Sequence, residues 1–218
     1  MRDRNAPLTA AEAPALAWNK MDGLLPAIVQ DADTGQVLML GYMDSDGLDA
    51  TQQTGFVTFF SRSRGRLWTK GETSGNRLSV RAIHPDCDGD ALLVRAVPEG
   101  PTCHLGTPSC FTDMGPSGVG WLGQLRRIVE QRAAADPETS YTARLLAKGP
   151  VRIAQKIGEE GVEVALAGAV GDKEGCISET ADLLYHISVL MQARGFGWDD
   201  VAAELDKRHA EPPTARSA

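Results

Sequence analysis

The sequence predicts two domains, an N-terminal β-rich α+β domain followed by an all-α domain. Short alternating apolar runs dominate the chain before about residue 112, whereas apolar residues at helical spacing dominate after it. Between these regions, residues 112–120 hold three glycines and a proline, a composition typical of a linker. We therefore expect one domain over 1–113 and a second over 114–218.

The N-terminal region contains short runs rich in β-branched and aromatic residues, with Gly, Asp and Asn between them, which indicate strands and hairpins. One helix is expected over 45–54, because Asp44 or Ser45 can cap its start and Gly55 follows its end. This region should be mostly sheet with a single helix. The expected strands are 28–29, 36–40, 56–61, 66–68, 78–84 and 91–97.

The C-terminal region begins with an amphipathic helix, since apolar residues from Trp121 to Val129 follow the i, i+3, i+4, i+7 spacing. Ser140 can cap a short second helix, and Pro150 suits the first turn of a third. Further helices are expected over 141–148, 150–169, 176–194 and 199–209. The Pro/Ala/Ser-rich tail beyond them is expected to be disordered.

The chain of 218 residues has 22 Lys+Arg against 29 Asp+Glu, a formal net charge of −7. This acidic balance argues against a nucleic-acid-binding surface. Residues 1–14 lack the apolar core of a signal peptide, and no run approaches the ~18 apolar residues of a membrane span. We therefore expect a cytoplasmic protein that contacts neither nucleic acid nor membrane. In a reducing compartment, clustered cysteines more often indicate a metal than a disulfide.

A loop between two expected strands carries Asp86, Asp88 and Asp90 at alternate positions. An EF-hand begins with the same spacing, but Ala91 stands where that loop needs glycine and Val97 where it needs glutamate. A charged β-turn and a metal site both stay open for this loop. Repulsion among three close carboxylates favours the metal.

Cys87 lies inside the same loop, and Cys103 and Cys110 follow without any C-x-x-C pair. Three thiolates leave one open position on a tetrahedral zinc, which is the arrangement of a catalytic site. Small buried cysteines are the alternative. We favour a metal because one cysteine lies between carboxylates and another precedes a histidine. His84 or His104 could be a fourth ligand or a general base.

A hairpin over residues 61–76 gathers groups that could bind an anionic nucleotide. Its basic side chains can donate to phosphate, its tryptophan offers a plane for a base, and its Gly-Glu-x-Ser-Gly turn can bring backbone amides close to a ligand. A solvated hairpin is the alternative, and these residues alone do not decide between the two. The candidate substrate-binding residues are Arg62, Arg64, Trp68, Lys70, Glu72 and Ser74.

These motifs resemble phosphoribosyl-AMP cyclohydrolase over most of residues 24–111. The resemblance lies in W-x-K-G-E-x-S-G-N at 68–76, D-C-D-x-D at 86–90, and the C-H and C-F pairs at 103–104 and 110–111. It implies that Cys87, Cys103 and Cys110 hold a catalytic zinc, with Cys87 and the later pair coming from different subunits of an intertwined homodimer. It further implies magnesium at Asp86, Asp88 and Asp90, and His104 as the base. Residues 105–108 are less typical of the family but leave the ligands untouched.

The third and fourth expected C-terminal helices carry acidic residues three or four positions apart, which share one face. A solvated acidic surface is the usual explanation, but apolar neighbours such as Ile157 and Leu183 border these acids. Mg²⁺ prefers such oxygen ligands and usually binds substrate phosphates as well. The acids are Glu159, Glu160, Glu163, Glu179 and Asp182.

E-E-x-x-E followed by E-x-x-D is typical of the MazG-like α-helical nucleotide pyrophosphohydrolases. With S-Y-T at 140–142, L-A-K-G at 146–149 and K-I-G-E-E at 156–160, residues 121–209 resemble phosphoribosyl-ATP pyrophosphohydrolase. The resemblance implies that all five acids bind magnesium, which orients water and stabilises the pyrophosphate leaving group. Lys148 and Lys156 are weaker phosphate-binding candidates. Cys176 is expected to be a packed helix residue, and His186 to lie in the core or behind the ligands.

Together the resemblances imply a bifunctional histidine-biosynthesis enzyme. It would cleave phosphoribosyl-ATP to phosphoribosyl-AMP and pyrophosphate, then hydrolyse the N1–C6 bond of the adenine ring. A nucleotide-sanitising hydrolase joined to a divergent deaminase is one alternative. A zinc-stabilised dimerisation module with no enzymatic activity is another.

Overall fold

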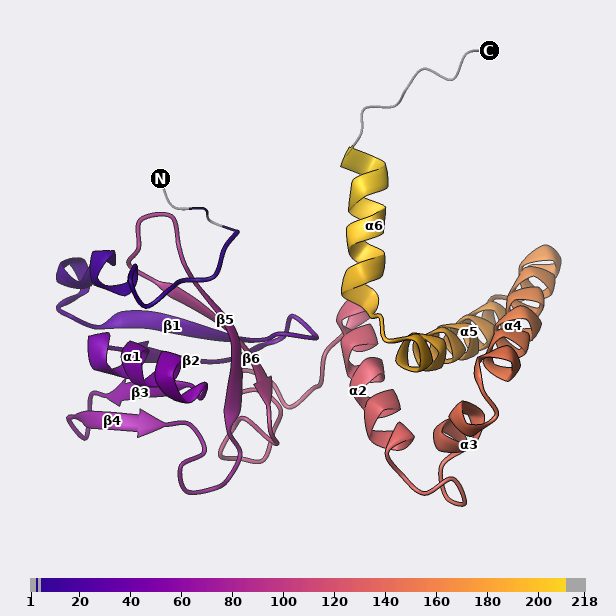
Figure 1. Ribbon diagram of the computed structural model, residues 1–218, viewed down its shortest axis with the longest axis horizontal. Helices are drawn as coiled ribbons and strands as arrows, with labels where there is room; N and C mark the ends of the chain where they lie inside the picture. The colour runs from indigo at the N-terminus through magenta and orange to yellow at the C-terminus, as the bar shows by residue number, and fades with distance from the viewer. Residues whose placement is uncertain (1–2, 4, 211–218) are drawn as a thin grey trace, which may run out of the picture. The chain divides into compact units, whose positions relative to one another are not determined.

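The structure is a computed structural model that describes residue 3 and residues 5–210. It divides into two units, one ending at Trp121 and one beginning at Leu122 (Figure 1). The first is sheet-rich and the second is all-helical, which confirms the predicted fold class at this level. Within the described residues, no helix is long and apolar enough to cross a membrane.

The structure divides the chain after Trp121, whereas the sequence suggested 113/114, because the linker packs on the first unit. The Gln36 side-chain amide donates to the Met114 carbonyl oxygen at 3.0 Å. Gly120 lies so close to Thr34 that a Cβ at this position would be 2.5 Å from the Thr34 carbonyl oxygen. Glycine therefore permits the linker's close approach to the sheet-rich unit.

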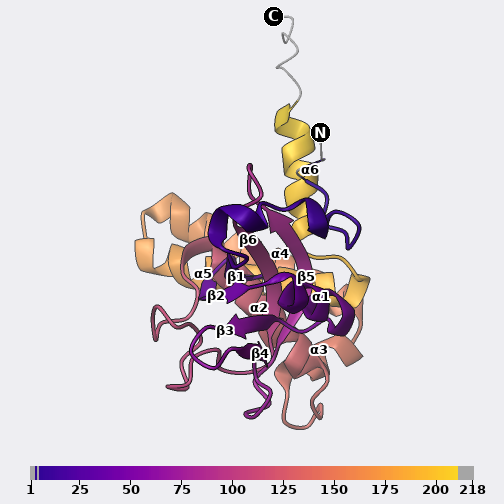
Figure 2. The same ribbon diagram turned by 90° about the vertical axis from the view of Figure 1, so that its left-hand side faces the viewer.

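The first unit contains a four-stranded sheet of order β2-β1-β6-β5 and a separate hairpin, β3-β4 (Figure 2). β1 pairs antiparallel with β2 and parallel with β6, and β6 pairs antiparallel with β5. All the expected strands are confirmed, although β1 extends well beyond the expected 28–29. The strands are β1 (Leu25–Asp31), β2 (Val37–Met43), β3 (Thr58–Ser61), β4 (Arg66–Thr69), β5 (Leu78–Pro85) and β6 (Leu92–Pro98).

Helix α1 (Ser45–Thr54) has the predicted bounds and packs against β3 and β4. The Asp44 carboxylate accepts a hydrogen bond from the Gly47 amide at 2.7 Å and caps the start of the helix. Gly55 follows its end with a φ of 74°, a left-handed conformation that favours glycine. Both ends are therefore determined by neighbouring residues, which explains why the sequence predicted them.

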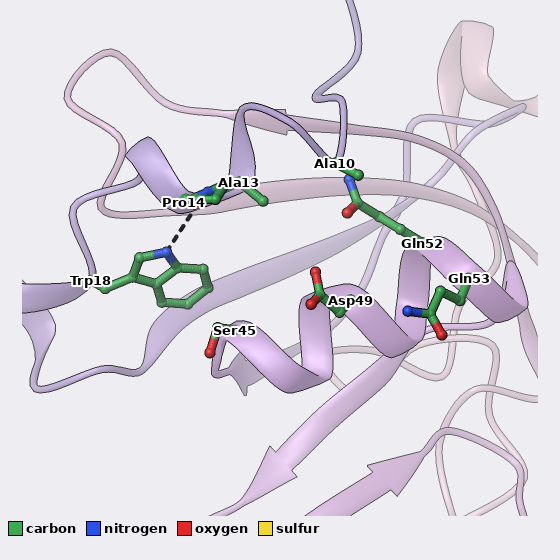
Figure 3. A pocket seen from close by; sticks show the side chains of 8 residues that line it. All are labelled: Ala10, Ala13, Pro14, Trp18, Ser45, Asp49, Gln52 and Gln53. Atoms are coloured by element: carbon green, nitrogen blue, oxygen red, sulfur yellow. Dashed lines mark hydrogen bonds between the residues drawn. The ribbon is translucent and has the colours of Figure 1, made fainter.

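An N-terminal arm (residues 8–22) crosses one side of the first unit and contains two 3₁₀ helices, η1 (Ala13–Ala15) and η2 (Trp18–Met21). The sequence did not predict them, since single turns carry no apolar period. Leu8 and Ala13 of the arm are buried in the sheet's core. Figure 3 shows the arm facing α1 across a cavity of about 460 Å³, with the Trp18 indole donating to the Ala13 carbonyl oxygen at 3.0 Å.

The second unit is built on an antiparallel pair of long helices, α4 and α5, which lie side by side (Figure 1). α5 begins three positions before the expected 176, because the Asp172 carboxylate caps it by accepting from the Gly175 amide at 3.0 Å. The expected tail beyond residue 210 lies outside the described residues. The helices are α2 (Trp121–Ala133), α3 (Tyr141–Ala147), α4 (Pro150–Val170), α5 (Lys173–Arg194) and α6 (Trp198–Ala210), and a single 3₁₀ turn, η3 (Gly118–Gly120), precedes α2.

Candidate active sites

Two of the predicted zinc ligands lie together in the loop that follows β6. The Cys103 amide donates to the Thr107 carbonyl oxygen at 3.0 Å and closes a tight turn. The Cys110 amide donates to the Leu38 carbonyl oxygen of β2 at 2.7 Å, which attaches the end of the loop to the sheet. These backbone contacts bring the Cys103 and Cys110 thiols within hydrogen-bonding reach of each other.

The two thiols have opposite pKa shifts. The backbone N–H of Leu105 and the Thr107 side chain stabilise the Cys103 thiolate and lower its pKa. Burial of the Cys110 thiol and the charge of Cys103 raise the Cys110 pKa. Lys70, at the end of β4, is buried close to both; burial lowers its pKa, while the two thiolates act to raise it. Cys103 is therefore the first to ionise, beside a cation that favours the thiolate.

The third predicted thiol, Cys87, lies elsewhere in the unit. Among the described residues it groups with Asp86 and Asp88, whose possible ligand atoms all lie within 4.8 Å of one another. The structure therefore brings together two of the three thiols of one chain. His104 remains beside the pair, with its Nδ1 at 3.8 Å from the Cys103 sulfur.

Asp86 organises the aspartate loop (residues 86–90) between β5 and β6. One of its carboxylate oxygens accepts hydrogen bonds from three backbone amides, those of Gly89 at 2.9 Å, Asp90 at 3.0 Å and Ala91 at 3.2 Å. This is the charged turn that the sequence left open as an alternative to a metal site. Its second oxygen makes none of these bonds, so the turn and a cation site are compatible.

A cation already lies among the other carboxylates of this loop. The Lys20 ammonium of the N-terminal arm is 2.5 Å from an Asp88 oxygen and 3.3 Å from an Asp90 oxygen. These contacts lower the pKa of Asp88 and raise that of Lys20. The geometry of the loop thus fits a bound cation, with the ammonium in that position here.

The hairpin over 61–76 is held in shape by several of the predicted substrate-binding residues. The Glu72 carboxylate accepts from the Arg66 guanidinium at 3.0 Å, and the Ser74 hydroxyl accepts from the Asn76 amide at 3.3 Å. Gly71 has a φ of 83°, and a Cβ there would lie 2.4 Å from the Asn76 carbonyl oxygen. In this structure, then, Glu72 and Ser74 shape the turn.

The aromatic and basic side chains of the hairpin divide between packed and exposed positions. Trp68 stacks on Phe59, with ring centroids 5.8 Å apart and planes at 25°. The Arg62 guanidinium lies 4.0 Å from the centroid of the Tyr42 ring. Arg64 is exposed at the tip, where its charge is accessible to an anion.

Three of the five predicted acids lie together where α4 and α5 pack, and they form the acidic cluster. The Glu160, Glu179 and Asp182 carboxylates each offer an oxygen within 4.8 Å of the others. Glu160 is buried. Glu163 lies beside it. The hydrogen bond from Lys156 is the main cause that lowers the Glu160 pKa, with a smaller contribution from Glu163, whereas the hydrogen bond to Glu160 raises the Glu163 pKa. Such close carboxylates fit a divalent cation, which would relieve their repulsion.

Lys156 connects this cluster to a neighbouring acid. Its ammonium is 2.6 Å from Glu160 and 2.8 Å from Glu159, and both contacts raise its pKa. Arg152 also pairs with Glu159, at 3.4 Å. Glu159 is exposed and held by these two cations, outside the group formed by the other acids. Lys148 is exposed at the end of α3.

His186 lies behind the acidic cluster and is buried. Its Nδ1 is 2.9 Å from the Asp182 carbonyl oxygen, to which it can donate, and 3.8 Å from a Glu160 oxygen. The Tyr141 hydroxyl lies 3.4 Å from its Nε2. The sequence singled out His186 but missed Tyr141, because α3 and α5 meet only in the folded unit. Cys176 is half-buried where α4 and α5 pack, as expected.

Comparison with known proteins identifies both units. The family model of phosphoribosyl-AMP cyclohydrolase matches residues 39–112, and that of phosphoribosyl-ATP pyrophosphohydrolase matches residues 122–209. The chain belongs to the bifunctional histidine-biosynthesis family. Cys103 and Cys110 fall in the first match, and the acidic cluster falls in the second.

Full-length relatives support the same conclusion, and each is named histidine biosynthesis bifunctional protein HisIE. The Xanthomonas axonopodis pv. citri protein is 57% identical over 206 residues, covering 94% of this chain and 98% of the relative. The Escherichia coli K12 protein is 55% identical, covering 93% and 99%. The Photobacterium profundum protein is 53% identical, covering 88% and 95%. Membership of this bifunctional family makes the chain a hydrolase with both activities, as the sequence predicted.

Proposed function

We propose that the two activities reside in separate sites, one in each unit. The all-helical unit cleaves phosphoribosyl-ATP to phosphoribosyl-AMP and pyrophosphate, and the sheet-rich unit hydrolyses the N1–C6 bond of that product. The observation that carries this assignment is that each unit holds its own ligand cluster inside its own family match. Neither alternative considered from the sequence accounts for both matches in one chain.

In the helical unit, we propose a MazG-like fold in which magnesium binds Glu160, Glu179 and Asp182, with Glu163 at the edge of the site. Hard carboxylate oxygens suit Mg²⁺, which would bind the triphosphate and stabilise the pyrophosphate leaving group when present. Lys156 lies close enough to Glu160 to add positive charge beside a bound phosphate. Its pairing with Glu159 argues that Glu159 has a supporting role.

In the sheet-rich unit, we propose zinc at Cys103 and Cys110, completed by Cys87. Thiolates are suitable zinc ligands, and zinc with an open position can lower the pKa of its bound water to about 7. We propose that His104, whose Nδ1 lies 3.8 Å from the Cys103 sulfur, moves a proton to the departing ring nitrogen. The carboxylates of the aspartate loop form a second cation site, for magnesium.

Some residues of the hairpin are proposed to contact the substrate directly, and others to support it by stabilising the turn. Arg64 is exposed and Lys70 adjoins the thiols, so both are proposed to contact the substrate's phosphate groups. Trp68, which stacks on Phe59, is proposed to offer a plane for the base, and Arg62, which lies over the Tyr42 ring, is proposed to bind an anionic group. Glu72 and Ser74 are proposed to support the substrate through the turn that they stabilise.

We propose that the protein is a homodimer in which each zinc is shared between subunits. The separation of Cys87 from the other two thiols in one chain supports this arrangement. Exposed apolar side chains supply surface for a second copy in both units. On the sheet these are Ile28, Val37 and Leu40, and on α4 they are Val162, Leu166 and Val170, which share a face. We also propose that the protein works in the cytoplasm, a reducing compartment that suits its free cysteines.

A two-step assay tests the assignment of sites. Purified protein with Zn²⁺ and Mg²⁺ should convert phosphoribosyl-ATP to the ring-opened formimino carboxamide ribonucleotide, and no product would refute the proposal. Cys103→Ser should accumulate phosphoribosyl-AMP, whereas Glu163→Ala should impair pyrophosphate release and leave added phosphoribosyl-AMP a substrate. If Glu163→Ala instead blocked only ring opening, the sites would be assigned to the wrong units.

A further inference from the structure

The ammonium of Lys20 lies between two carboxylates that are 68 and 70 positions away in the chain. It is 2.5 Å from Asp88 and 3.3 Å from Asp90. Lys20 belongs to η2 of the N-terminal arm, whereas the aspartate loop connects β5 to β6. The contact therefore depends on the tertiary fold, which brings one positive charge into a loop with three carboxylates.

Backbone contacts of residues that precede Lys20 hold the arm in this position. The Ala17 amide donates to the Gly89 carbonyl oxygen at 2.8 Å, at the tip of the aspartate loop. Further back, the Leu8 amide donates to the Ile83 carbonyl oxygen of β5 at 2.7 Å, and the Leu8 side chain is buried in the core. The arm is thus anchored independently of the Lys20 side chain, whose flexible stem can move while the backbone stays.

We propose that Lys20 is a built-in competitor of the divalent cation at the aspartate loop. Its ammonium neutralises Asp88 and Asp90 while the loop holds no metal, and a divalent cation displaces it upon binding. The inference rests on the proposed magnesium site at this loop.

The displacement follows from the chemistry of the two cations. An ammonium only donates hydrogen bonds, so it cannot remain as a ligand, and the oxygens that it occupies are those that Mg²⁺ needs. A divalent cation brings twice the charge to the same carboxylates and would repel the ammonium at this distance. Lys20 is half exposed, so the released ammonium can enter solvent without rearranging the core.

The first test measures cation affinity with Mn²⁺ as the probe, by electron paramagnetic resonance on the zinc-loaded full chain. Glu179→Gln with Asp182→Asn forms the background, because these changes weaken competing binding in the helical unit. Lys20→Met should bind Mn²⁺ about fivefold more tightly than its parent, as expected for loss of an exposed ion-pair competitor. Lys20→Arg retains the charge and should stay within about twofold of the parent. Lys148→Met is the matched control for loss of one positive charge elsewhere.

The second test uses the unmodified sequence and reads the lysine directly. Acetylation rates of individual lysines are measured by mass spectrometry with and without Mg²⁺. The Lys20 rate should rise severalfold with Mg²⁺, since its ammonium leaves the carboxylates, while the rate of exposed Lys148 stays constant. This readout does not depend on activity or on the folding of any variant.

The outcomes separate this inference from the proposed metal site. Equal Mn²⁺ affinity for the parent and Lys20→Met, or an unchanged Lys20 acetylation rate, would overturn the competitor role and leave the metal site standing. Absence of Mn²⁺ binding at the loop in every variant would overturn both. Weaker binding by Lys20→Met would show that Lys20 supports the metal site, contrary to the proposal.

Discussion

The Lys156 ammonium lies 2.6 Å from the Glu160 carboxylate, whose side chain is only 6% exposed. This pair, one turn apart on α4, gives the innermost acid of the helical site a fixed counter-ion. The hydrogen bond from Lys156 is the main cause of the lowered Glu160 pKa. The chain therefore keeps a charged carboxylate at the site without bound metal.

Removing this counter-ion should destabilise the metal-free helical unit. Lys156→Met leaves the Glu160 charge buried and without its ammonium partner. We expect the free energy of unfolding to fall by about 1 to 2 kcal/mol, which is less than the cost of breaking a fully buried ion pair because Lys156 is partly exposed. Urea unfolding followed by circular dichroism measures the change. Saturating Mg²⁺ should restore much of the lost stability. Lys148→Met, at an exposed position, should change the free energy of unfolding little. Equal losses in both variants would contradict this role for the pair.

The two adjacent glutamates of α4 should respond differently to substitution. Glu160 belongs to the clustered acids, whereas Glu159 pairs with Lys156 and Arg152 outside them. Glu160→Gln should lower pyrophosphate release by more than about 100-fold, since even residues behind metal ligands cost about 10- to 100-fold. Glu159→Gln should stay within about threefold. Initial rates at saturating Mg²⁺ test this, and a severe defect in Glu159→Gln would restore it as a direct ligand.

Magnesium binding in the helical unit should depend on pH through Glu163. Its pKa is raised by the hydrogen bond to Glu160 and by the charges of Glu160 and Glu179. Because Mg²⁺ requires the ionised carboxylate, affinity should fall as pH drops through this raised pKa. The loss should begin at higher pH than for an ordinary glutamate, whose pKa is about 4.3.

Pyrophosphate release at sub-saturating Mg²⁺ measures this dependence across about pH 5 to 8. The glutamine of Glu163→Gln cannot ionise. This variant should bind Mg²⁺ more weakly than the unmodified protein, and its affinity for Mg²⁺ should vary less with pH in that window. An identical pH profile for Glu163→Gln and the unmodified protein would assign the titration to another group.

Features determined by nearby residues could be predicted from the sequence. The caps of α1 at Asp44 and Gly55 are local, as is the helical spacing that places Glu160 and Glu163 on one face. The predicted start of α5 was wrong because Asp172 can both end a turn and cap a helix, and the sequence does not distinguish these roles.

Features that depend on long-range contacts could not be predicted in this way. Lys20 reaches the aspartate loop across 68 positions, and nothing in its own neighbourhood marks it as a partner. The pairing of Glu159 with cations was missed for another reason. A spacing of three or four residues shows which side chains are neighbours, but the choice between metal and lysine depends on burial. The cysteine pattern and the motif resemblance identified the three thiols and implied that Cys87 comes from a different subunit. Within one chain, the structure groups Cys87 with Asp86 and Asp88 rather than with the other two thiols.

That separation leads to a prediction about mixed dimers. If each zinc binds Cys87 of one subunit and Cys103 with Cys110 of the other, Cys87→Ser and Cys103→Ser chains should complement each other. Each mixed dimer then has one complete site, so random mixing should restore about a quarter of the cyclohydrolase activity. The control mixes Cys103→Ser with Cys110→Ser, which damage the same half-site and should give no recovery. Zinc content measured on the mixtures should follow activity. Sites contained within single chains would leave both mixtures inactive, because every chain would then lack one of its own ligands.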